Sequence, residues 1–436
     1  MKALVIVIIG MSIIMSTSCV SLRNNYLGKS ERAVTFQNPD IKKLARIDSF
    51  RQNFDYKADS LLLIINHRKH KNKHLTANEI NQLYSNFGEQ LENDRIYNGI
   101  LHRRNRHNDH LSKMERYAGA KLLLSAYRYN SSYSKNFTVR RNLNRGDRAN
   151  NIPPNLLGAS RNYLYSTSIR KALVNKDNTL FDVSDSILQI LPSTNIIKSG
   201  FYRIHLRTDI LYSLSRWVFH NIGNQLLNKH QDPMYHRTYQ RLYAQQLLSV
   251  IKPYDILLMK SPNFISNELI PGYFGHASIW LGTDIKKRNK HRILNLSNKK
   301  ITIHTRGMAE AIKSGVKMST LRNYAEGKTY IIMRLKDISE PEKNMILQQT
   351  ANQLGKSYDF NFDIESPDEI NCTELVYLAY DFINWRVITY MGRYTIFPDD
   401  ILYTAQNNQR FEIVAILKNG VLINNPDILT IKECMK

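Results

Sequence analysis

The chain has 436 residues, of which 42% are hydrophobic and 22% charged. That length exceeds what one hydrophobic core supports, and the composition excludes an intrinsically disordered chain, so two or three globular domains are expected. The formal net charge of +24 favours anionic partners such as nucleic acid, anionic lipid or acidic cell-wall polymers, and charge alone does not choose among them.

Cysteine is rare in this sequence. The three cysteines are Cys19, Cys372 and Cys434, which are too few for a disulfide framework. A single bridge between Cys372 and Cys434 remains an open alternative to free thiols.

The first 19 residues have the layout of an export signal. Met1 and Lys2 give a positive start, and the apolar run 3–15 is shorter than the roughly 20 residues needed to span a bilayer. Small residues then precede Cys19, which resembles a bacterial lipoprotein signal, in which the cysteine carries the lipid chains. The alternatives are an ordinary secretory signal or an uncleaved anchor. We therefore expect a signal peptide at 1–19, lipidation of Cys19, a polar tether at 20–40, and a membrane-anchored envelope protein, periplasmic or outer-surface.

Residues 41–250 show helical patterns. A capping box of Thr76 and Glu79 precedes apolar residues at helical spacing, and 110–129 and 201–227 also read as amphipathic helices. The Asn-, Ser- and Arg-rich stretch 129–154 between them predicts a loop. We expect one mostly helical, basic domain at 41–250 whose role the sequence does not reveal.

Two histidine runs in this region could place ligands on one helical face or near arginines. No carboxylate or cysteine completes either run at a familiar metal-site spacing, so solvated faces are the preferred interpretation. The runs comprise His67, His70 and His74, and His102, His107 and His110.

The pattern changes near residue 251 and indicates a mixture of strands and helices. A helix is expected over 341–354, with Ser339 as its cap and Gly355 just past its end, and a second helix begins near Cys372. The fold class predicted for 251–425 is α+β, with 426–436 as a tail. The expected strands cover 254–259, 276–282, 291–296, 301–304 and 330–335.

Two residues in this region could perform nucleophilic chemistry. Cys372 lies where a loop enters a helix, and the helix N-terminus favours a thiolate and offers amide donors for an oxyanion. His276 opens a strand after a glycine-containing turn, so a rigid element would aim it as a base. Either residue alone is more often an ordinary structural or polar group, and 96 positions separate them in the chain.

The order of the motifs in this region strengthens that interpretation. Residues 251 to about 420 resemble the circularly permuted branch of NlpC-type papain-like cysteine hydrolases, the group typified by YiiX and YebB, in which the histidine precedes the cysteine. The motifs that carry the resemblance are Y-D-I-L-L, G-H-A-S-I-W-L-G, A-E-A-I-K-S-G-V, Y-I-I-M-R-L, G-K-S-Y-D-F-N-F, C-T-E-L and F-P-D-D-I.

The resemblance implies roles for the site residues and requires no metal or cofactor. Cys372 would attack a carbonyl, His276 would act as base and then as acid, and Glu310 would orient the imidazole. His304 and Asn295 are alternatives for the third role.

Four further residues would support these three. Asp255 and Glu374 match family positions and would stabilise structure, while Tyr273 would line the site or face solvent. Tyr358 would support the approach to the cysteine helix.

Three functions fit these features. The leading hypothesis is an envelope hydrolase that cleaves an amide bond in cell-wall peptides, with anionic envelope polymers as possible companions and no specific nucleic acid. The second is a lipid acyl hydrolase or acyltransferase, and the third is a catalytically silent, lipid-tethered binding module. Apolar residues that could admit an acyl chain, or pack in the core, are Phe264, Ile265, Leu269 and Ile270.

Overall fold

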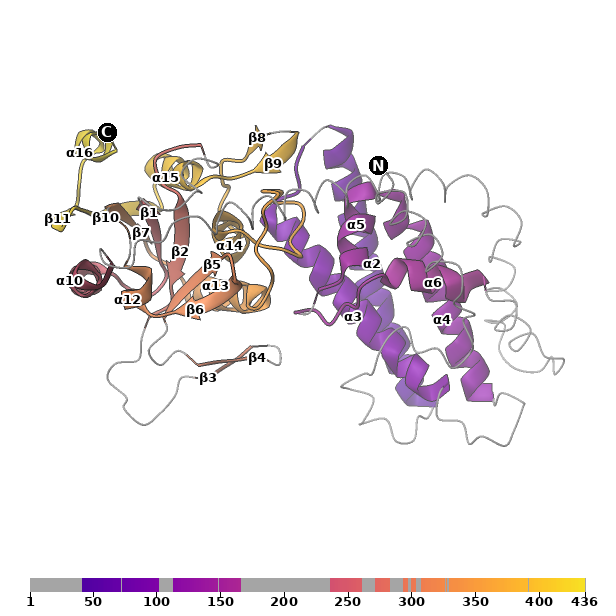
Figure 1. Cartoon of the computed structure of the whole chain (residues 1–436). Coiled ribbons are helices and arrows are strands. Elements are labelled where there is room, and N and C mark those ends of the chain that lie inside the picture. The colour runs from indigo at the N-terminus through magenta and orange to yellow at the C-terminus, as the bar shows by residue number, and fades with distance from the viewer. Residues whose placement is uncertain are drawn as a thin grey trace, which may run out of the picture. The chain divides into compact units, whose positions relative to one another are not determined.

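The structure, a computed structural model, forms two compact units (Figure 1). One unit holds the described residues of Met1–Leu62, Asn86–Gly146 and Ile152–His205, and the other holds those of Leu63–Ser85, Asp147–Asn151 and Leu206–Lys436. The units are discontinuous in sequence, whereas the expected domains were continuous. The structure describes residues 41–71, 73–101, 113–147, 149–165, 236–260, 271–282, 293–296, 299–302, 307–325, 327, 329–390 and 392–435.

The first unit is helical, as its sequence pattern predicts. One expected loop is wrong, because the stretch 129–154 contains the helix α5. Its N-cap is Asn136, whose side chain accepts a hydrogen bond from the Val139 amide, and Gly146 ends it with a positive φ. Helices with residues in this unit are α2 (Ile41–His70), α3 (Ala77–Leu101), α4 (Lys113–Ser131), η2 (Tyr133–Lys135), α5 (Phe137–Arg145) and α6 (Leu156–Tyr165).

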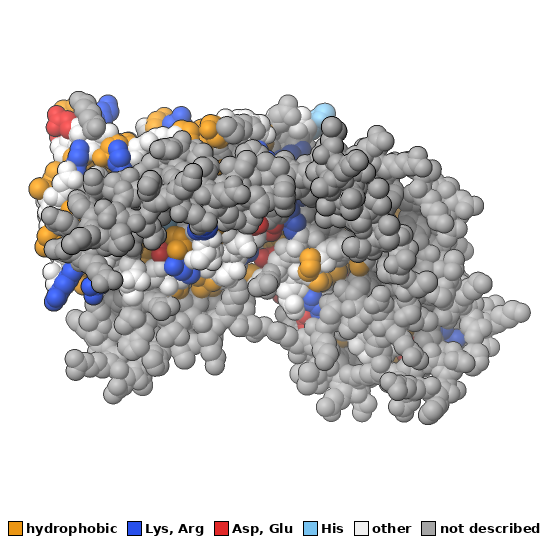
Figure 2. Space-filling model, viewed as in Figure 1, with side chains coloured by type: hydrophobic (Ala, Val, Ile, Leu, Met, Phe, Trp, Pro, Cys, Tyr) orange, Lys and Arg blue, Asp and Glu red, His pale blue; other side chains and the backbone are white. Residues whose placement is uncertain are grey.

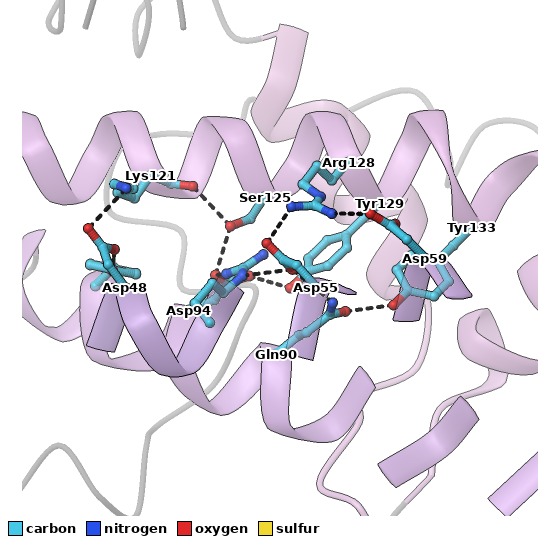
Figure 3. Close-up of polar contacts among 12 residues, drawn as sticks. Asp48, Asp55, Asp59, Gln90, Asp94, Lys121, Ser125, Arg128, Tyr129 and Tyr133 are labelled. Atoms are coloured by element: carbon cyan, nitrogen blue, oxygen red, sulfur yellow. Dashed lines mark hydrogen bonds and ion pairs between the residues drawn. The ribbon is translucent and has the colours of Figure 1, made fainter. Parts of the chain in front are cut away.

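Buried charges join the helices of the first unit (Figure 3). Asp94 is fully buried, accepts a hydrogen bond of 2.8 Å from Ser125 Oγ, and forms an ion pair with Arg51. Burial raises the pKa of Asp94, although Arg51 and the hydroxyls of Tyr129 and Ser125 oppose that shift. Since a buried charge is tolerated when paired, this network is a structural feature of the helix packing.

The second unit contains a seven-stranded antiparallel sheet in the order β11-β10-β7-β1-β2-β5-β6. The two-stranded sheets β3-β4 and β8-β9 are separate from it. The strands are β1 (Asp255–Lys260), β2 (His276–Trp280), β3 (Ile293–Leu296), β4 (Lys299–Thr302), β5 (Met308–Ile312), β6 (Gly315–Ser319), β7 (Thr329–Leu335), β8 (Ile388–Tyr390), β9 (Arg393–Thr395), β10 (Phe411–Lys418) and β11 (Val421–Asn424).

Helices pack on this sheet and complete an α+β architecture (Figure 1). Tyr243 and Leu247 of α10 share one apolar core with Leu257 of β1 and Tyr324 of α12. The helix α14 contacts β2, β5 and α13. The expected tail contains the helix α16. The helices of this unit's C-terminal part are α10 (His236–Val250), α12 (Leu321–Tyr324), α13 (Glu340–Gln353), α14 (Cys372–Ala379), α15 (Pro398–Asn407) and α16 (Ile428–Cys434).

Local signals in this unit are confirmed where the structure describes them. Ser339 caps α13 in a capping box with Glu342, and Gly355 follows the helix with a φ of +81°. Thr76 and Glu79 form the other expected capping box at the start of α3. Cys372 and Cys434 are free thiols, so the bridge that the sequence left open is not formed.

Asp255 ties the first strand of the sheet to its neighbour β7. Its carboxylate is fully buried and accepts hydrogen bonds from Arg334 Nε at 2.8 Å and Nη2 at 2.7 Å, and from the Lys252 amide at 2.7 Å. Asp255→Ala would remove the two short hydrogen bonds of the Arg334 guanidinium and leave it only the Val250 carbonyl oxygen and the Glu412 carboxylate at 3.8 Å. We expect the substitution to lower the free energy of unfolding by about 3 kcal/mol in urea titrations. Glu340→Ala, which removes an exposed ion pair with Lys343, should leave it unchanged within the error of the titration. Equal effects of the two substitutions would contradict this role.

Candidate active site

Cys372 is the first residue of α14, and the sequence fixes the start of that helix. The Asn371 side chain accepts hydrogen bonds from the amides of Thr373 and Glu374, both at 3.0 Å. In return, the Glu374 carboxylate accepts from the Asn371 amide at 3.0 Å and from Asn371 Nδ2 at 2.7 Å. This capping box places the thiol, which is 1% exposed, at the positive end of the helix. The Asn371 cap also engages the Thr373 and Glu374 amides, two of the donors that the sequence analysis expected to be available for an oxyanion.

His276 and Glu310 lie on adjacent strands of the sheet. His276 opens β2, and Glu310 is in β5, paired in register with Ser278. The distance from His276 Nε2 to Glu310 Oε2 is 3.2 Å, and the hydroxyl of Ser319 in β6 donates to Glu310 Oε1. The carboxylate is therefore held from one side by Ser319 while it faces the imidazole.

Electrostatics link the imidazole to the thiol and the carboxylate. Burial lowers the pKa of His276, but hydrogen bonds and charge interactions with Cys372 and Glu310 outweigh burial and raise it to about 10. Burial would raise the pKa of Glu310, yet its contact with His276 lowers it. Both shifts favour an imidazolium beside a carboxylate.

Two residues at this site, Tyr324 and Ser319, were not predicted from the sequence. A third, Tyr358, was predicted only to support the approach to the cysteine helix. The ring of Tyr324 lies 5.8 Å from the His276 ring, centroid to centroid. Tyr358 lies beside Cys372, and burial together with the neighbouring Cys372 and Glu374 charges raises its pKa well above the usual value. Ser319 could have been found, because the Gly315 hairpin turn brings β6 back beside Glu310.

Tyr273 packs beside Lys260 and Thr329. Its hydroxyl oxygen is 3.2 Å from Thr329 Oγ1, and Lys260 Nζ lies 3.7 Å from its ring centroid.

The Asp255 carboxylate accepts hydrogen bonds from Arg334, and Glu374 caps the helix α14, as described above. Burial and then the neighbouring Asp359 charge raise the pKa of Glu374. Both carboxyls thus have structural contacts, and their supporting roles in catalysis stay predictions.

Asp399 holds the backbone that leads into His276. Its two carboxylate oxygens accept from the Tyr273 amide at 2.7 Å and from the Phe274 amide at 3.0 Å. Gly272 has a φ of +121°, and a Cβ there would lie 2.6 Å from Asp399 Oδ2, so only glycine fits. The Pro-Asp-Asp segment therefore acts on the histidine turn from α15.

We expect Asp399→Ala to lower kcat/KM by about tenfold, because two freed amides would let the His276 turn shift. Asp399→Asn keeps one acceptor and should lose less. Asp427→Ala, which removes the exposed cap of α16, serves as the matched control and should leave kcat/KM within twofold. Steady-state kinetics on an amide substrate measure this, and unchanged kinetics for Asp399→Ala would refute the positioning role.

Several expected sites fall outside the described residues. This applies to the proposed lipidation site and signal, to one alternative third residue, to the apolar group near 264–270, to the helix at 201–227 and to the second histidine run. Asn295 lies on β3, but its side chain is not described. The predicted site residues that lie outside the described residues are Cys19, His304, Phe264, Ile265, Leu269, Ile270, His102, His107 and His110.

Metal-binding clusters and membrane-spanning helices are both absent from the part of the chain that the structure describes. No group of three His, Cys, Asp or Glu side chains in it could hold a metal ion. None of its helices combines the length and the apolar character that crossing a membrane demands. A surface groove lined by Phe411, Pro426 and Ile431 shares no residue with the Cys372 site.

Comparison with known families adds one finding. Residues 250–416 match the Peptidase_C92 family, described as a permuted papain-like amidase enzyme of the YaeF/YiiX, C92 family. This range includes Cys372, His276, Glu310 and Asp399, and it excludes the helical unit. No curated protein and no solved structure matches the chain.

Proposed function

We propose, on the premise that residues 250–416 belong to the permuted papain-like amidase family, that Cys372, His276 and Glu310 are the catalytic residues of a cysteine hydrolase acting on cell-wall peptides. The family supports a cysteine hydrolase that cleaves amide bonds. The observation that carries the residue assignment is the position of His276, which interacts with Cys372 and with Glu310 at once.

The arrangement suits an acyl-transfer reaction in two steps. The Cys372 thiolate attacks the amide carbonyl carbon, and the His276 imidazolium then gives its proton to the amine nitrogen as the carbon–nitrogen bond breaks. The resulting thioester is attacked by water, whose proton returns to His276. The products are an amine and a carboxylic acid, and the thiolate–imidazolium pair is regenerated.

The carboxylate of Glu310 orients the imidazole throughout this cycle. Its hydrogen bond at 3.2 Å stabilises the protonated ring, and Ser319 fixes the carboxylate in turn. The hydroxyl of Tyr358 beside Cys372 is suited to donate to the oxyanion, since the helix cap engages the Thr373 and Glu374 amides.

Cell-wall peptides are the proposed substrate because the sequence suggests export and carries a strong positive charge. Residues 1–19 resemble a lipoprotein signal, which would place the enzyme on the envelope, and the net charge of +24 suits anionic wall polymers. Among the described residues on the face in Figure 2, Lys and Arg side chains occur in several separate groups.

A substrate panel tests this proposal. The full chain and its Cys372→Ala variant are incubated with muropeptides and, separately, with phospholipid vesicles, and products are followed by mass spectrometry. We expect new amine and carboxylate termini in the muropeptides with the wild type alone. Release of fatty acid instead would support a lipid acyl hydrolase, and the absence of both products would support a silent binding module, so either result would refute the peptidase assignment.

A further inference from the structure

A segment far upstream of the family match belongs to the catalytic unit. Residues Leu63–Ser85, which span the end of α2 and the start of α3, group with the sheet domain and not with the helical unit. The family match begins at residue 250. The compact unit that contains the family match therefore also includes a separate segment of the N-terminal region.

The backbone of Leu75 is the centre of this association. Its amide donates to Glu365 Oε1 at 2.8 Å, and its carbonyl oxygen accepts from the Tyr377 hydroxyl at 2.9 Å. Leu75 is fully buried, and Glu365 and Tyr377 are also buried. The Leu75 backbone thus hydrogen-bonds with both Glu365 and Tyr377 in a buried environment, where such hydrogen bonds contribute most.

Three further contacts surround this one. Lys69 forms an ion pair with the same Glu365 carboxylate. Asn81 Nδ2 donates to the Leu378 carbonyl oxygen at 3.2 Å and to Asp381 Oδ2 at 2.8 Å. The capping box at Thr76 fixes the start of α3 between these contacts.

The partners on the catalytic side belong to two elements that define the nucleophile's position. Glu365 lies in the segment that leads from Ser357 to the helix start at Asn371, and Tyr377 and Leu378 lie on α14 itself. Leu75 therefore joins the approach to the nucleophile helix with the helix that carries Cys372. Because α14 also packs against β2, a shift of α14 would change the geometry between Cys372 and His276.

We propose that residues 63–85 form a positioning segment of the hydrolase, in which the Leu75 backbone, through Glu365 and Tyr377, holds the Cys372 helix against the His276 strand. This inference rests on the proposed function of Cys372 and His276. It assigns a role to a part of the N-terminal region that lies outside the family match. Glu365 and Tyr377 act through Cys372 and do not touch substrate.

The test measures alkylation of Cys372 by iodoacetamide at pH 6 in the full chain, relative to Cys434 of the same molecule, by peptide mass spectrometry. We expect Glu365→Ala and Tyr377→Phe to slow Cys372 labelling by about tenfold, because a small displacement weakens its pairing with His276. Glu365→Gln keeps an acceptor for the Leu75 amide and should restore the rate to within about threefold of wild type. Glu340→Ala, on the exposed end of α13, is the matched control and should have no effect.

Circular dichroism in the near ultraviolet separates positioning from loss of structure, because at pH 6 either change would remove the pairing with His276 and slow the labelling of Cys372. A variant in which Cys372 is only mispositioned keeps the wild-type spectrum, whereas an unfolded variant loses it. Unchanged or faster labelling in Glu365→Ala and Tyr377→Phe would overturn the positioning role while leaving the proposed function intact. A wild-type Cys372 that reacts no faster than Cys434 would overturn the proposed function, and the inference with it.

Discussion

Cys372→Ala is expected to abolish amide hydrolysis, with kcat/KM reduced on the order of 10⁴-fold or more, because the substitution removes the atom that forms the thioester. His276→Ala should reduce kcat/KM by about 10²- to 10⁴-fold, since it removes the acid and base but leaves the nucleophile. Steady-state kinetics with muropeptides, or with any amide substrate found in the panel above, measure both variants.

Cys434 supplies the matched control for these substitutions. It is the other free thiol among the described residues and lies in α16. Cys434→Ala should therefore leave kcat/KM within twofold of the wild type. Residual activity above about 1% in Cys372→Ala would contradict the nucleophile assignment, and loss of activity in Cys434→Ala would transfer the role to the other thiol.

Glu310→Gln is expected to move the alkaline limb of the pH–rate profile toward neutral pH. In the wild type the pKa of His276 is about 10, so the imidazolium that protonates the leaving amine persists to that pH. Removing the Glu310 charge lowers this pKa toward its ordinary value of 6.5 and should reduce kcat/KM near pH 9 by at least about tenfold. The profile of kcat/KM from pH 5 to 11 measures the shift.

The same pKa has a consequence for stability. Because the pKa of His276 is higher in the folded chain, its contribution to the free energy of unfolding is complete below about pH 6.5 and is lost as the pH rises through about 10.

Glu412→Gln, at a half-exposed carboxylate on β10, is the control for Glu310→Gln and should leave the pH–rate profile unchanged. An alkaline limb in Glu310→Gln at the same pH as in the wild type would show that Glu310 does not orient His276.

Local chemistry made much of the second unit predictable. The cap at Ser339 and the glycine after the helix set both ends of α13, and short runs of mostly apolar residues, nearly all of them buried, identified β1, β2 and β7. The helix α5 was missed because its Asn- and Arg-rich composition masked an Asn136 cap and the apolar spacing of Val139 and Leu143, four positions apart. Composition is a weaker signal than caps and periodicity when a helix is short.

Long-range partners could not be predicted from local patterns. The hydrogen bond from the Leu75 amide to the Glu365 carboxylate joins residues that are 290 positions apart, and no sequence motif at either residue predicts this contact. Cys372 and His276 were paired only through the resemblance to a family, since they are 96 positions apart in the chain and only the fold sets their distance. Tyr324 lies at the site because the short helix α12 follows β6, and this position becomes clear only once the sheet order is known.

The pairing of Cys372 with His276 is tested most directly by competitive alkylation of the two free thiols at pH 6. An ordinary thiol with a pKa near 8.5 is almost entirely protonated there and reacts slowly. We predict that iodoacetamide labels Cys372 at least about tenfold faster than Cys434, and that His276→Ala removes the difference. Equal labelling of the two cysteines in the wild type, or fast labelling of Cys372 that survives His276→Ala, would contradict the catalytic pair.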